Sequence, residues 1–238
     1  MDNQTSSVPK HIGIIMDGNG RWATMRQQSR SYGHHQGAAI IYDIVKACKN
    51  RGVKYLTLYA FSYENNKRPK DEVETLLHIF VDSITKYFEG MQENKVRFNF
   101  IGDLEHFDPS VRESFEWCKE ETKNNDAIEL TISINYSSRD EIRRAVQNIA
   151  TEVKNNKIQV EDIDENMISG HLDTALLPDP DLIIRTGGEY RLSNFLLWQA
   201  SYAELYFTDV LWPDFTEQHL AEAIESYSHR QRRFGQVK

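Results

Sequence analysis

The sequence contains few of the features that would cross-link the chain or place it in a membrane. It has only two cysteines, Cys48 and Cys118, so neither a disulfide framework nor a cysteine metal cluster is expected. Apolar runs such as Phe195–Trp198 are far too short to span a bilayer, and the polar start MDNQTSSVPK has no signal-peptide core. These absences predict a cytoplasmic protein whose cysteines are reduced packing residues.

An excess of positive charge is also missing. The formal net charge is -8, which argues against nucleic acid as a partner, because nucleic-acid-binding proteins present a basic surface. Arginines nevertheless recur beside glycines and predicted turns. An anionic ligand would have to bind where the fold brings these loops together, since most isolated surface arginines are simply solvated.

No stretch rich in proline, glycine or serine divides the chain, and no repeat is visible. A length of 238 residues suits one large domain with a good core. We therefore predict a single domain over 11–235, preceded by a flexible start over 1–10 and followed by a short tail over 236–238.

Strand-like and helix-like patterns alternate along the chain. Helices are predicted over 36–51 and 71–88. A third is predicted to begin at a possible Ser138–Glu141 capping box and to reach Val153, and a last one to begin at about Thr216. A long polar loop is expected between the first strand and residue 36. The order of strands and helices is typical of βαβ units, and predicts an α/β fold with a central, mostly parallel sheet flanked by helices. The expected strands are apolar or alternating, and lie at 12–15, 53–61, 96–101, 128–135 and 181–185.

The most informative motif is HIGIIMDGNGRW, from His11 to Trp22. A short apolar strand ends on Asp17, and Gly18 and Gly20 then allow a sharp turn that brings backbone N–H groups close to a ligand. A carboxylate can hold a divalent cation, and such a turn can hold a phosphate. Taken alone, the motif fits an ordinary strand followed by an Asp-Gly turn equally well.

A second motif contains two arginines, Arg185 and Arg191, which flank a Gly-Gly turn. Ser193 follows, just before the apolar segment FLLW, which is expected to be helical. Arginine forks match phosphate oxygens, and a helix N-terminus adds partial positive charge, so the motif can bind a diphosphate. The alternative is an arginine pair bound to surface carboxylates, with the serine as a helix cap.

The predicted strands end on polar residues: Asp17, Ser62, Asn135 and Arg185. In open α/β sheets, ligands bind in the crevice beyond the carboxyl ends of the strands. Loops that are far apart in the sequence are therefore expected to share one site.

These motifs, in this order, resemble the cis-prenyltransferase family, in particular its bacterial undecaprenyl diphosphate synthases. The similarity runs from His11 to Gly235. It rests on MDGNGRW, on Arg30 with Gly33-His34, on LTLYAFSYEN with KRP, and on RTGGEYRLSNFLLWQ and AELYFTDVLWPDF.

The resemblance implies head-to-tail addition of isopentenyl diphosphate to an allylic diphosphate such as farnesyl diphosphate, with Mg²⁺ as cofactor. Asp17 would bind Mg²⁺ and assist the leaving diphosphate, Glu204 would lie near the metal, and Asn65 would take part in proton removal. By the same resemblance, the substrate-binding residues would be Gly18, Asn19, Gly20, Arg21, Trp22, Arg30, His34, Ser62, Tyr63, Glu64, Arg68, Arg185, Arg191, Leu192 and Ser193.

The family's chemistry also requires an apolar tunnel that opens at the carboxyl ends of the strands, because water must be kept from an allylic cation. The family's Arg-x-Gly end, here Arg233–Gly235, implies a homodimer, and release of a lipid product implies transient membrane contact. The resemblance does not fix the product length. The chain departs from the family at Asn66, where a Trp is usual, so the loop around it is expected to close differently.

Two other interpretations of these motifs conflict with particular residues. A haloacid dehalogenase-type phosphatase needs a nucleophilic Asp at the position of Ile15, and an apolar side chain cannot attack phosphorus. A non-catalytic partner subunit of a related synthase would not need to retain Asp17, Arg185 and Glu204 together.

Overall fold

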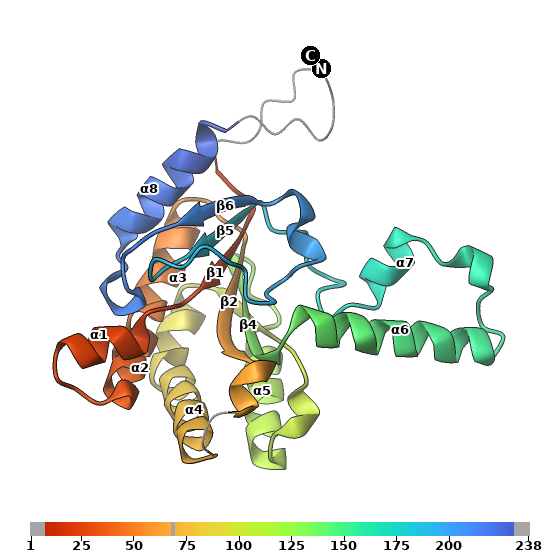
Figure 1. The fold of residues 1–238 in the computed structure, drawn as a ribbon, viewed down its shortest axis with the longest axis horizontal. Helices are drawn as coiled ribbons and strands as arrows, with labels where there is room; N and C mark the ends of the chain where they lie inside the picture. Colours follow the sequence, from red (N-terminus) through yellow and green to blue (C-terminus); the bar gives the residue numbers. More distant parts are fainter. Residues whose placement is uncertain (1–7, 68–69, 231–238) are drawn as a thin grey trace.

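The computed structural model describes residues 8–67 and 70–230. In this part of the chain one sheet has the strand order β3-β4-β2-β1-β5-β6, and each neighbouring pair is parallel. The predicted α/β fold with a mostly parallel sheet is therefore confirmed (Figure 1). The strands are β1 His11–Ile15, β2 Tyr55–Ser62, β3 Val96–Ile101, β4 Ile128–Tyr136, β5 Leu182–Arg185 and β6 Glu204–Phe207.

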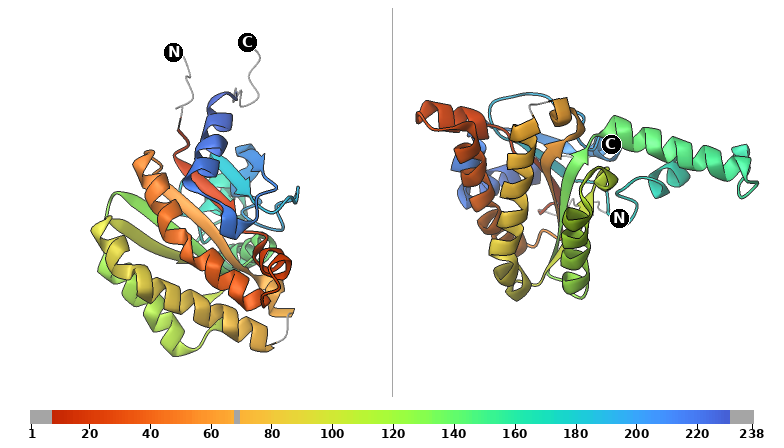
Figure 2. Two further views of the ribbon diagram at one scale, coloured as in Figure 1. Left: turned by 90° about the vertical axis from the view of Figure 1, so that its left-hand side faces the viewer. Right: turned by 90° about the horizontal axis from the view of Figure 1, so that it is seen from below.

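Helices connect these strands and follow the last of them. Helix α6 runs away from the body of the molecule, with α7 beside it, as two different views show (Figures 1 and 2). The α-helices in the described residues are α1 Asn19–Met25, α2 Arg30–Ala39, α3 Ile41–Asn50, α4 Lys70–Glu93, α5 Pro109–Thr122, α6 Ser138–Lys154, α7 Glu165–Gly170 and α8 Glu217–Ser228.

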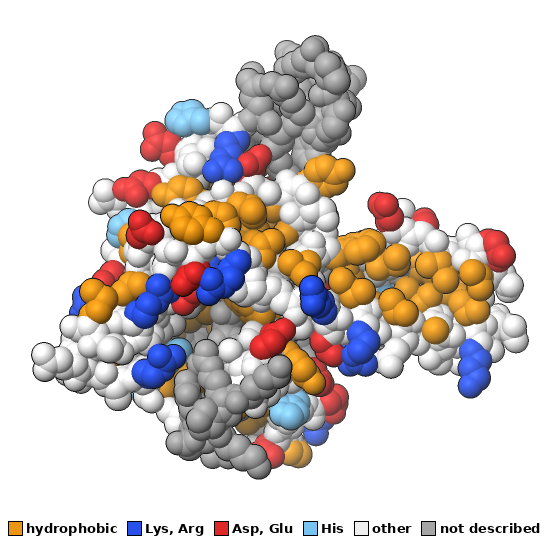
Figure 3. Space-filling view, viewed as in Figure 1, with side chains coloured by type: hydrophobic (Ala, Val, Ile, Leu, Met, Phe, Trp, Pro, Cys, Tyr) orange, Lys and Arg blue, Asp and Glu red, His pale blue; other side chains and the backbone are white. Residues whose placement is uncertain are grey.

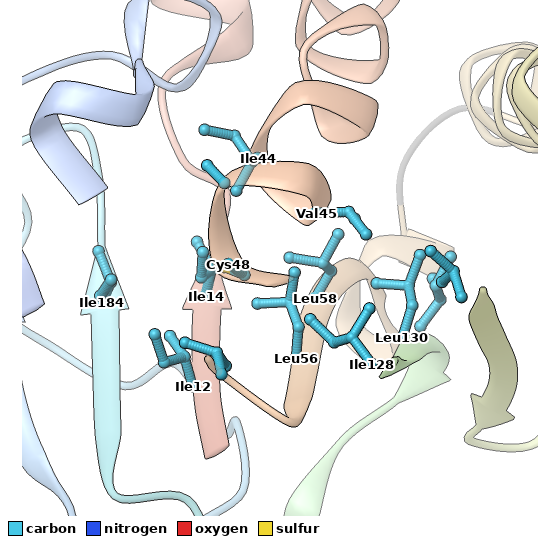
Figure 4. Close-up of a cluster of buried hydrophobic side chains, with 14 of the residues drawn as sticks. Ile12, Ile14, Ile44, Val45, Cys48, Leu56, Leu58, Ile128, Leu130 and Ile184 are labelled. Carbon is cyan, nitrogen blue, oxygen red and sulfur yellow. The ribbon is translucent and has the colours of Figure 1, made fainter. Parts of the chain in front are cut away.

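The larger core lies between one face of the sheet and helices α3, α4, α5 and α8. Ile12 and Ile14 on β1 point to this face, where Ile44 and Cys48 of α3 cover them (Figure 4). The period of two along each strand explains the arrangement, because alternate side chains point to the same face. Cys48 and Cys118 are both free and buried, as expected for packing residues.

A smaller cluster covers the opposite face of the sheet. Ile15 and Tyr59 pack there against Phe195 and Leu196, which come from the loop after β5. Gly13 contributes to this close approach, because a Cβ atom at this position would lie 3.1 Å from Cε1 of Phe195. The loop that carries the second arginine motif is thus fixed to the sheet by apolar contacts.

The prediction of a long polar loop before residue 36 is wrong. This segment forms α1 and α2, and the predicted helix over 36–51 is divided between α2 and α3 at Ile40. Small residues make the packing of α1 and α2 possible: a Cβ on Gly33 would lie 2.0 Å from the backbone oxygen of Asn19. A helix whose buried face is glycine and alanine shows no hydrophobic period, so pattern analysis misses it.

The predicted Ser138–Glu141 capping box is also absent. Ser137 is the N-cap of α6, and the Ser138 hydroxyl instead accepts a hydrogen bond from the backbone N–H of Leu197. Glu141 is buried and accepts hydrogen bonds from the Tyr136 hydroxyl and from the backbone N–H of Asp173. These side chains join α6 to neighbouring loops and do not cap the helix.

The strand order places β1 between β2 and β5, so the chain reverses direction across the sheet at β1. Ile15, the last residue of β1, is paired with Tyr59 on one side and with Arg185 on the other. Such a reversal point is where ligands bind in open α/β sheets, because the connecting helices leave in opposite directions and open a crevice.

His11 lies at the opposite end of β1 and is 1% exposed. Its ring is held between the carbonyl oxygen of Pro178 at 2.6 Å and the hydroxyl of Thr57 at 2.8 Å. Burial lowers its pKa from 6.5 to about 4, against the opposing effects of the Pro178 carbonyl and the Asp181 carboxylate. Between about pH 4 and pH 6.5, His11 is therefore neutral in the folded protein and protonated in the unfolded chain.

Because the folded-state pKa is lowered, the unfolded state binds the additional proton below about pH 6.5, and stability is lost as the pH falls toward 4. Between pH 7 and pH 4.5 we expect His11 to remove about 2 kcal/mol of unfolding free energy. Urea unfolding at both pH values measures the loss of unfolding free energy. The loss in His11→Gln should be smaller than in wild type by this amount, whereas His78→Gln, at an exposed position of α4, should lose as much as wild type. Equal losses in all three proteins would contradict the assignment.

Within residues 8–67 and 70–230, none of the helices combines the length and apolarity needed to cross a bilayer. The predicted start over 1–10 lies mostly outside the described residues, and the predicted tail over 236–238 lies entirely outside them.

Candidate active site

A cavity of about 710 Å³ opens at the carboxyl ends of β1, β2, β4 and β5. It brings together both sequence motifs, as the strand-end argument predicts. The predicted site residues that line it are Asp17, Gly18, Asn19, Gly20, Arg30, His34, Ser62, Glu64, Asn65, Arg185, Arg191 and Ser193.

Asp17 lies two residues beyond β1, beside the end of β5. Its Oδ2 accepts a hydrogen bond from Nη2 of Arg185 at 2.9 Å, and its Oδ1 lies 3.3 Å from Nη2 of Arg21. Thr186 holds the Asp17 backbone by accepting from its N–H and donating to its carbonyl oxygen. The side chain is 30% exposed, so this carboxylate is held by two cations while it still faces the cavity.

The glycines of the first motif have steric roles. Gly18 is the N-cap of α1 with φ of 112°, and a Cβ there would lie 2.9 Å from Cδ2 of Leu211. A Cβ on Gly20 would lie 2.8 Å from Cζ of Arg30. The absence of side chains at these positions therefore lets the Arg30 guanidinium lie directly against α1 at the cavity wall.

Arg185 organises the second motif. Its Nη1 donates to the backbone oxygen of Arg191 at 2.5 Å and to the Ser193 hydroxyl at 2.7 Å, while Nη2 donates to Asp17. The Arg185 side chain is 4% exposed, whereas that of Arg191 is 58% exposed and pairs with Glu189. One buried guanidinium thus joins the serine, the second arginine and the aspartate of the first motif.

The segment FLLW is a turn and not the predicted helix. Ser193, Asn194 and Leu196 all have positive φ angles, of 47°, 66° and 46°. A helix N-terminus therefore does not contribute charge at Ser193. The turn is instead fixed by Phe195 and Leu196, which are fully buried on the second face of the sheet.

Tyr59 supports this turn from the cavity wall. Its hydroxyl donates to the backbone oxygens of Tyr136 at 3.2 Å and Ser193 at 3.3 Å. Burial is the main cause that raises the pKa of Tyr59, and the nearby Glu64 carboxylate adds to it. The phenol therefore stays neutral and acts as a hydrogen-bond donor that fixes the Ser193 backbone.

The 3₁₀ segment η1, Tyr63–Lys67, lies at the cavity edge after β2. Asn65 accepts a hydrogen bond from the backbone N–H of Ser62 through Oδ1 at 3.1 Å. Glu64 accepts another, at 2.8 Å, from Nδ2 of Asn194 on the opposite side of the site. The segment that carries the predicted catalytic Asn65 is therefore joined directly to the Ser193 turn.

Asn66, where the family usually has Trp, donates a hydrogen bond at 2.6 Å to Oδ1 of Asn135. Asn135 is the second-to-last residue of β4, has a φ of 49° in the left-handed region, and donates to the carbonyl oxygen of Asp103. The departure replaces an aromatic surface with a polar anchor between η1 and the end of β4.

Some predicted site residues lie outside the cavity lining. Trp22 donates from Nε1 to Asp214 at 2.6 Å, and the Arg26 guanidinium lies 4.0 Å from its ring centre. Leu192 packs with the buried cluster on the second face of the sheet. Arg21 reaches the site through its ion pair with Asp17, and Tyr63 is 45% exposed on η1. Trp22 and Leu192 thus have evident structural roles in this chain.

Glu204 is the predicted site residue that the fold separates most clearly from Asp17. It begins β6 and pairs in register with Leu182, whereas the cavity lies beyond Arg185 at the other end of these strands. Its carboxylate accepts a hydrogen bond from Nη1 of Arg230 at 2.6 Å. Arg68 lies outside the described residues.

Arg139 and Asn194 are polar residues of the cavity lining that were not predicted. Arg139 lines the cavity just after β4, and Asn194 joins the Ser193 turn to both η1 and the start of α6. Applying the strand-end argument to the residues after Asn135 could have identified Arg139. No sequence pattern indicated the role of Asn194, which depends on contacts between distant segments.

The fold and the cavity define an α/β protein with an arginine-lined cavity at the carboxyl edge of a parallel sheet. Comparison with known proteins identifies the family: residues 15–235 match the model described as putative undecaprenyl diphosphate synthase. The chain belongs to this family of isoprenyl transferases, which are cis-prenyltransferases, and the resemblance seen in the sequence is confirmed. The phosphatase interpretation is thereby excluded.

The similarity extends over nearly the whole chain. An isoprenyl transferase of Clostridium perfringens is 48% identical over 97% of this chain and 91% of its own length, and one of Fusobacterium nucleatum is 50% identical over 98% of both. Among solved structures, lavandulyl diphosphate synthase from Lavandula x intermedia, in complex with dimethylallyl diphosphate, superposes with a TM-score of 0.94 at 34% identity over 97% of this chain and 99% of its own. A probable undecaprenyl diphosphate synthase from Campylobacter jejuni gives 0.79 at 35% identity, over 96% and 99%.

Proposed function

We propose that this protein condenses isopentenyl diphosphate head-to-tail with an allylic diphosphate, farnesyl diphosphate in the first instance, to make a cis-polyprenyl diphosphate such as undecaprenyl diphosphate. The observation that carries the proposal is one cavity lined by arginines on two separate sides. Arg30 lies against the glycine turn on one side, Arg185 and Ser193 form the other, and Asp17 contacts Arg185 directly.

In this reaction the bond between the allylic carbon and its diphosphate breaks, and negative charge develops on the leaving group. Arg30 and the glycine turn would stabilise that charge, because preorganised cations act most strongly where charge appears in the transition state. Arg185 and Ser193 would hold the second diphosphate, so that the alkene carbon of isopentenyl diphosphate lies near the allylic carbon. A proton is then lost from C2 of the isopentenyl unit as the new double bond forms, and an oxygen of the released diphosphate can take it. Asn65, at the cavity edge, would position the reacting group for this step, because an amide is not basic enough to accept the proton itself.

Two carboxylates line the cavity in the described residues; Glu64 is bonded to Asn194, and Asp17 is the one that fits a Mg²⁺ ion. Mg²⁺ is usually held by one or two carboxylates together with substrate phosphates, and the partly exposed Asp17 meets this requirement. Bound there, the ion would neutralise charge on the leaving diphosphate. Glu204 lies at the amino end of β6, and the cavity lies beyond the carboxyl end of the neighbouring strand β5. Glu204 therefore does not lie beside Asp17 within one chain, and its predicted role at the metal stays a prediction.

The apolar tunnel would continue from the inner end of the cavity. A second, small apolar cavity of about 30 Å³ shares Ala38, Ile41 and Phe80 with the first and extends between α4 and strands β3 and β4. We propose that the growing prenyl chain enters here, displacing these side chains as it lengthens. Chromatography of the dephosphorylated product measures its length.

A homodimer is also proposed. Helix α6 projects from the body, and apolar side chains are exposed along this arm and the residues after it (Figures 1 and 3). Val146 is 54% exposed, Val160 63% and Leu176 94%. Burying such a surface against a second copy would remove it from water. The predicted contribution of Arg233–Gly235 falls outside the described residues.

The sequence also bears on the partners and the location of this protein. With a net charge of -8, nucleic acid is not proposed as a partner. A cytoplasmic location, with transient membrane contact when the lipid product is released, remains a prediction.

Incorporation of radiolabelled isopentenyl diphosphate into polyprenyl product, with farnesyl diphosphate and Mg²⁺, tests the proposal. We expect incorporation that requires both the allylic substrate and the metal. If the protein by itself incorporates no label but stimulates incorporation by a related synthase, the partner-subunit interpretation is favoured instead.

A further inference from the structure

Arg139 is a cation of the cavity wall that neither sequence motif contains. It is the second residue of α6, which begins two residues after the end of β4, and its side chain is exposed and lines the same cavity as Arg185, Arg191 and Ser193. The carboxyl end of β4 and the turn after β5 therefore supply cations to one opening. Figure 3 shows that basic side chains gather on this face of the molecule.

Asn194 fixes the backbone from which Arg139 extends. Its Oδ1 accepts from the N–H of Arg139 at 3.0 Å, and its backbone oxygen accepts from the N–H of Ser138 at 2.8 Å. Its Nδ2 donates to the Ser137 hydroxyl and to Glu64, both at 2.8 Å. The first N–H groups of α6 are thus occupied by protein acceptors, so the group that α6 presents to an anion is the Arg139 guanidinium.

The other cations of the Ser193 side already have partners within the protein. Arg185 bonds to Asp17 and Ser193, and Arg191 pairs with Glu189. Arg139 makes no ion pair with any other described residue. Its charge is therefore available to a ligand at no cost in broken contacts, whereas Arg191 must first release Glu189.

We propose that Arg139 is a further substrate-binding residue, which contacts the diphosphate held by Arg185 and Ser193. Because Asn194 ties Arg139, Ser193 and Glu64 together, the three groups would move as one unit when that diphosphate binds. The inference rests on the proposed function and adds a third arginine to the isopentenyl diphosphate side of the site. A diphosphate carries more negative charge than one paired arginine can neutralise, which is why a further cation on this side matters.

The chain offers a matched control on the same helix. Arg143 lies one turn further along α6, where it bonds to Asp140 and to Gln147, and it is absent from the cavity lining. Arg139→Gln and Arg143→Gln remove the same charge from the same helix. A difference between them therefore reports the position of the charge and not the net charge of the protein.

Steady-state kinetics of the full-length protein tests the proposal. For Arg139→Gln we expect the KM for isopentenyl diphosphate to rise about tenfold, as for the loss of one charge-assisted contact, with kcat and the KM for farnesyl diphosphate changed less than about threefold. The KM of Arg139→Lys for isopentenyl diphosphate should lie between those of wild type and Arg139→Gln, and the KM of Arg143→Gln should match wild type. An unchanged KM for isopentenyl diphosphate in Arg139→Gln, or an equal effect in Arg143→Gln, would overturn the proposal.

Calorimetric binding of inorganic pyrophosphate separates this inference from the proposed function. Wild type and Arg143→Gln should bind it with equal affinity, and Arg139→Gln more weakly by a similar factor of about ten at low salt. This measurement does not need turnover. If wild type fails to incorporate isopentenyl diphosphate, the proposed function is wrong; if pyrophosphate affinity is the same in all three proteins, the role of Arg139 is wrong.

Discussion

Asp17→Asn is expected to lower kcat for condensation by on the order of a thousandfold, the effect of removing a preorganised group that acts on developing charge. The variant keeps the size and hydrogen-bonding shape of the side chain but loses the negative charge that would hold Mg²⁺. Arg185 and Arg21 lose an ion-pair partner in the cavity. Turnover at saturating substrates and Mg²⁺, compared with wild type, gives the measured effect.

Binding of pyrophosphate shows whether the Asp17 variant keeps its site. Removing a carboxylate from a cavity that contains Arg30 and Arg185 makes its potential more positive, so metal-free pyrophosphate should bind Asp17→Asn at least as tightly as wild type. Asp108→Asn, at an exposed position before α5, serves as a charge-matched control with normal turnover. Loss of pyrophosphate binding would mean that the cavity has rearranged, and retained turnover would remove Asp17 from the mechanism.

Five of the six strands in the described residues could be predicted, because most of their residues are buried. The sixth, β6, was not predicted; its four residues are only half-buried. The predicted strands at 96–101 and 128–135 match β3 and β4 to within a residue, since β-branched and aromatic runs between turn signals leave few alternatives. The polar strand ends then predicted a shared crevice, because all parallel strands end at the same edge. Asp17 and Arg185 were accordingly expected together, and they are in direct contact.

The helices around the site were harder to predict. The packing of α1 on α2 depends on Gly33 and Gly37, whose value is the space they leave for Asn19 and not any hydrophobic pattern. The same limit applies to the turn at Ser193, where an apolar run is folded into positive φ angles by burial against the sheet. Local propensity cannot anticipate a conformation that tertiary contacts impose.

The position of Glu204 shows what strand order adds. In the sequence it stands in a segment that contains several aromatic residues, and nothing local says whether it begins or ends a strand. Pairing with Leu182 places it at the amino end of β6, with Arg230 as partner. A residue that starts a parallel strand lies at the sheet edge remote from the strand-end crevice. Glu204 could therefore act at a metal ion only if that ion were bound outside the cavity of its own chain.

Arg185→Lys is expected to reduce kcat/KM for isopentenyl diphosphate by several hundredfold, on the order of 3 kcal/mol or more. The guanidinium uses two nitrogens at once, one for Ser193 and the Arg191 backbone and one for Asp17. An ammonium group is a single point charge and cannot span both sides. Since the side chain is only 4% exposed, water cannot readily replace the lost contacts. Steady-state kinetics with isopentenyl diphosphate as the varied substrate measures the loss.

Arg191→Lys is the matched control for this result, because the Arg191 side chain is 58% exposed and contacts Glu189 through its guanidinium. We expect its kcat/KM to fall about tenfold, as for one charge-assisted contact. Ser193→Ala should lower kcat/KM in wild type, yet cost much less in the Arg185→Lys background, because the hydroxyl acts together with Nη1 of Arg185. Equal losses in the two lysine variants, or additive effects of Ser193→Ala and Arg185→Lys, would show that Arg185 does not organise the second anion site.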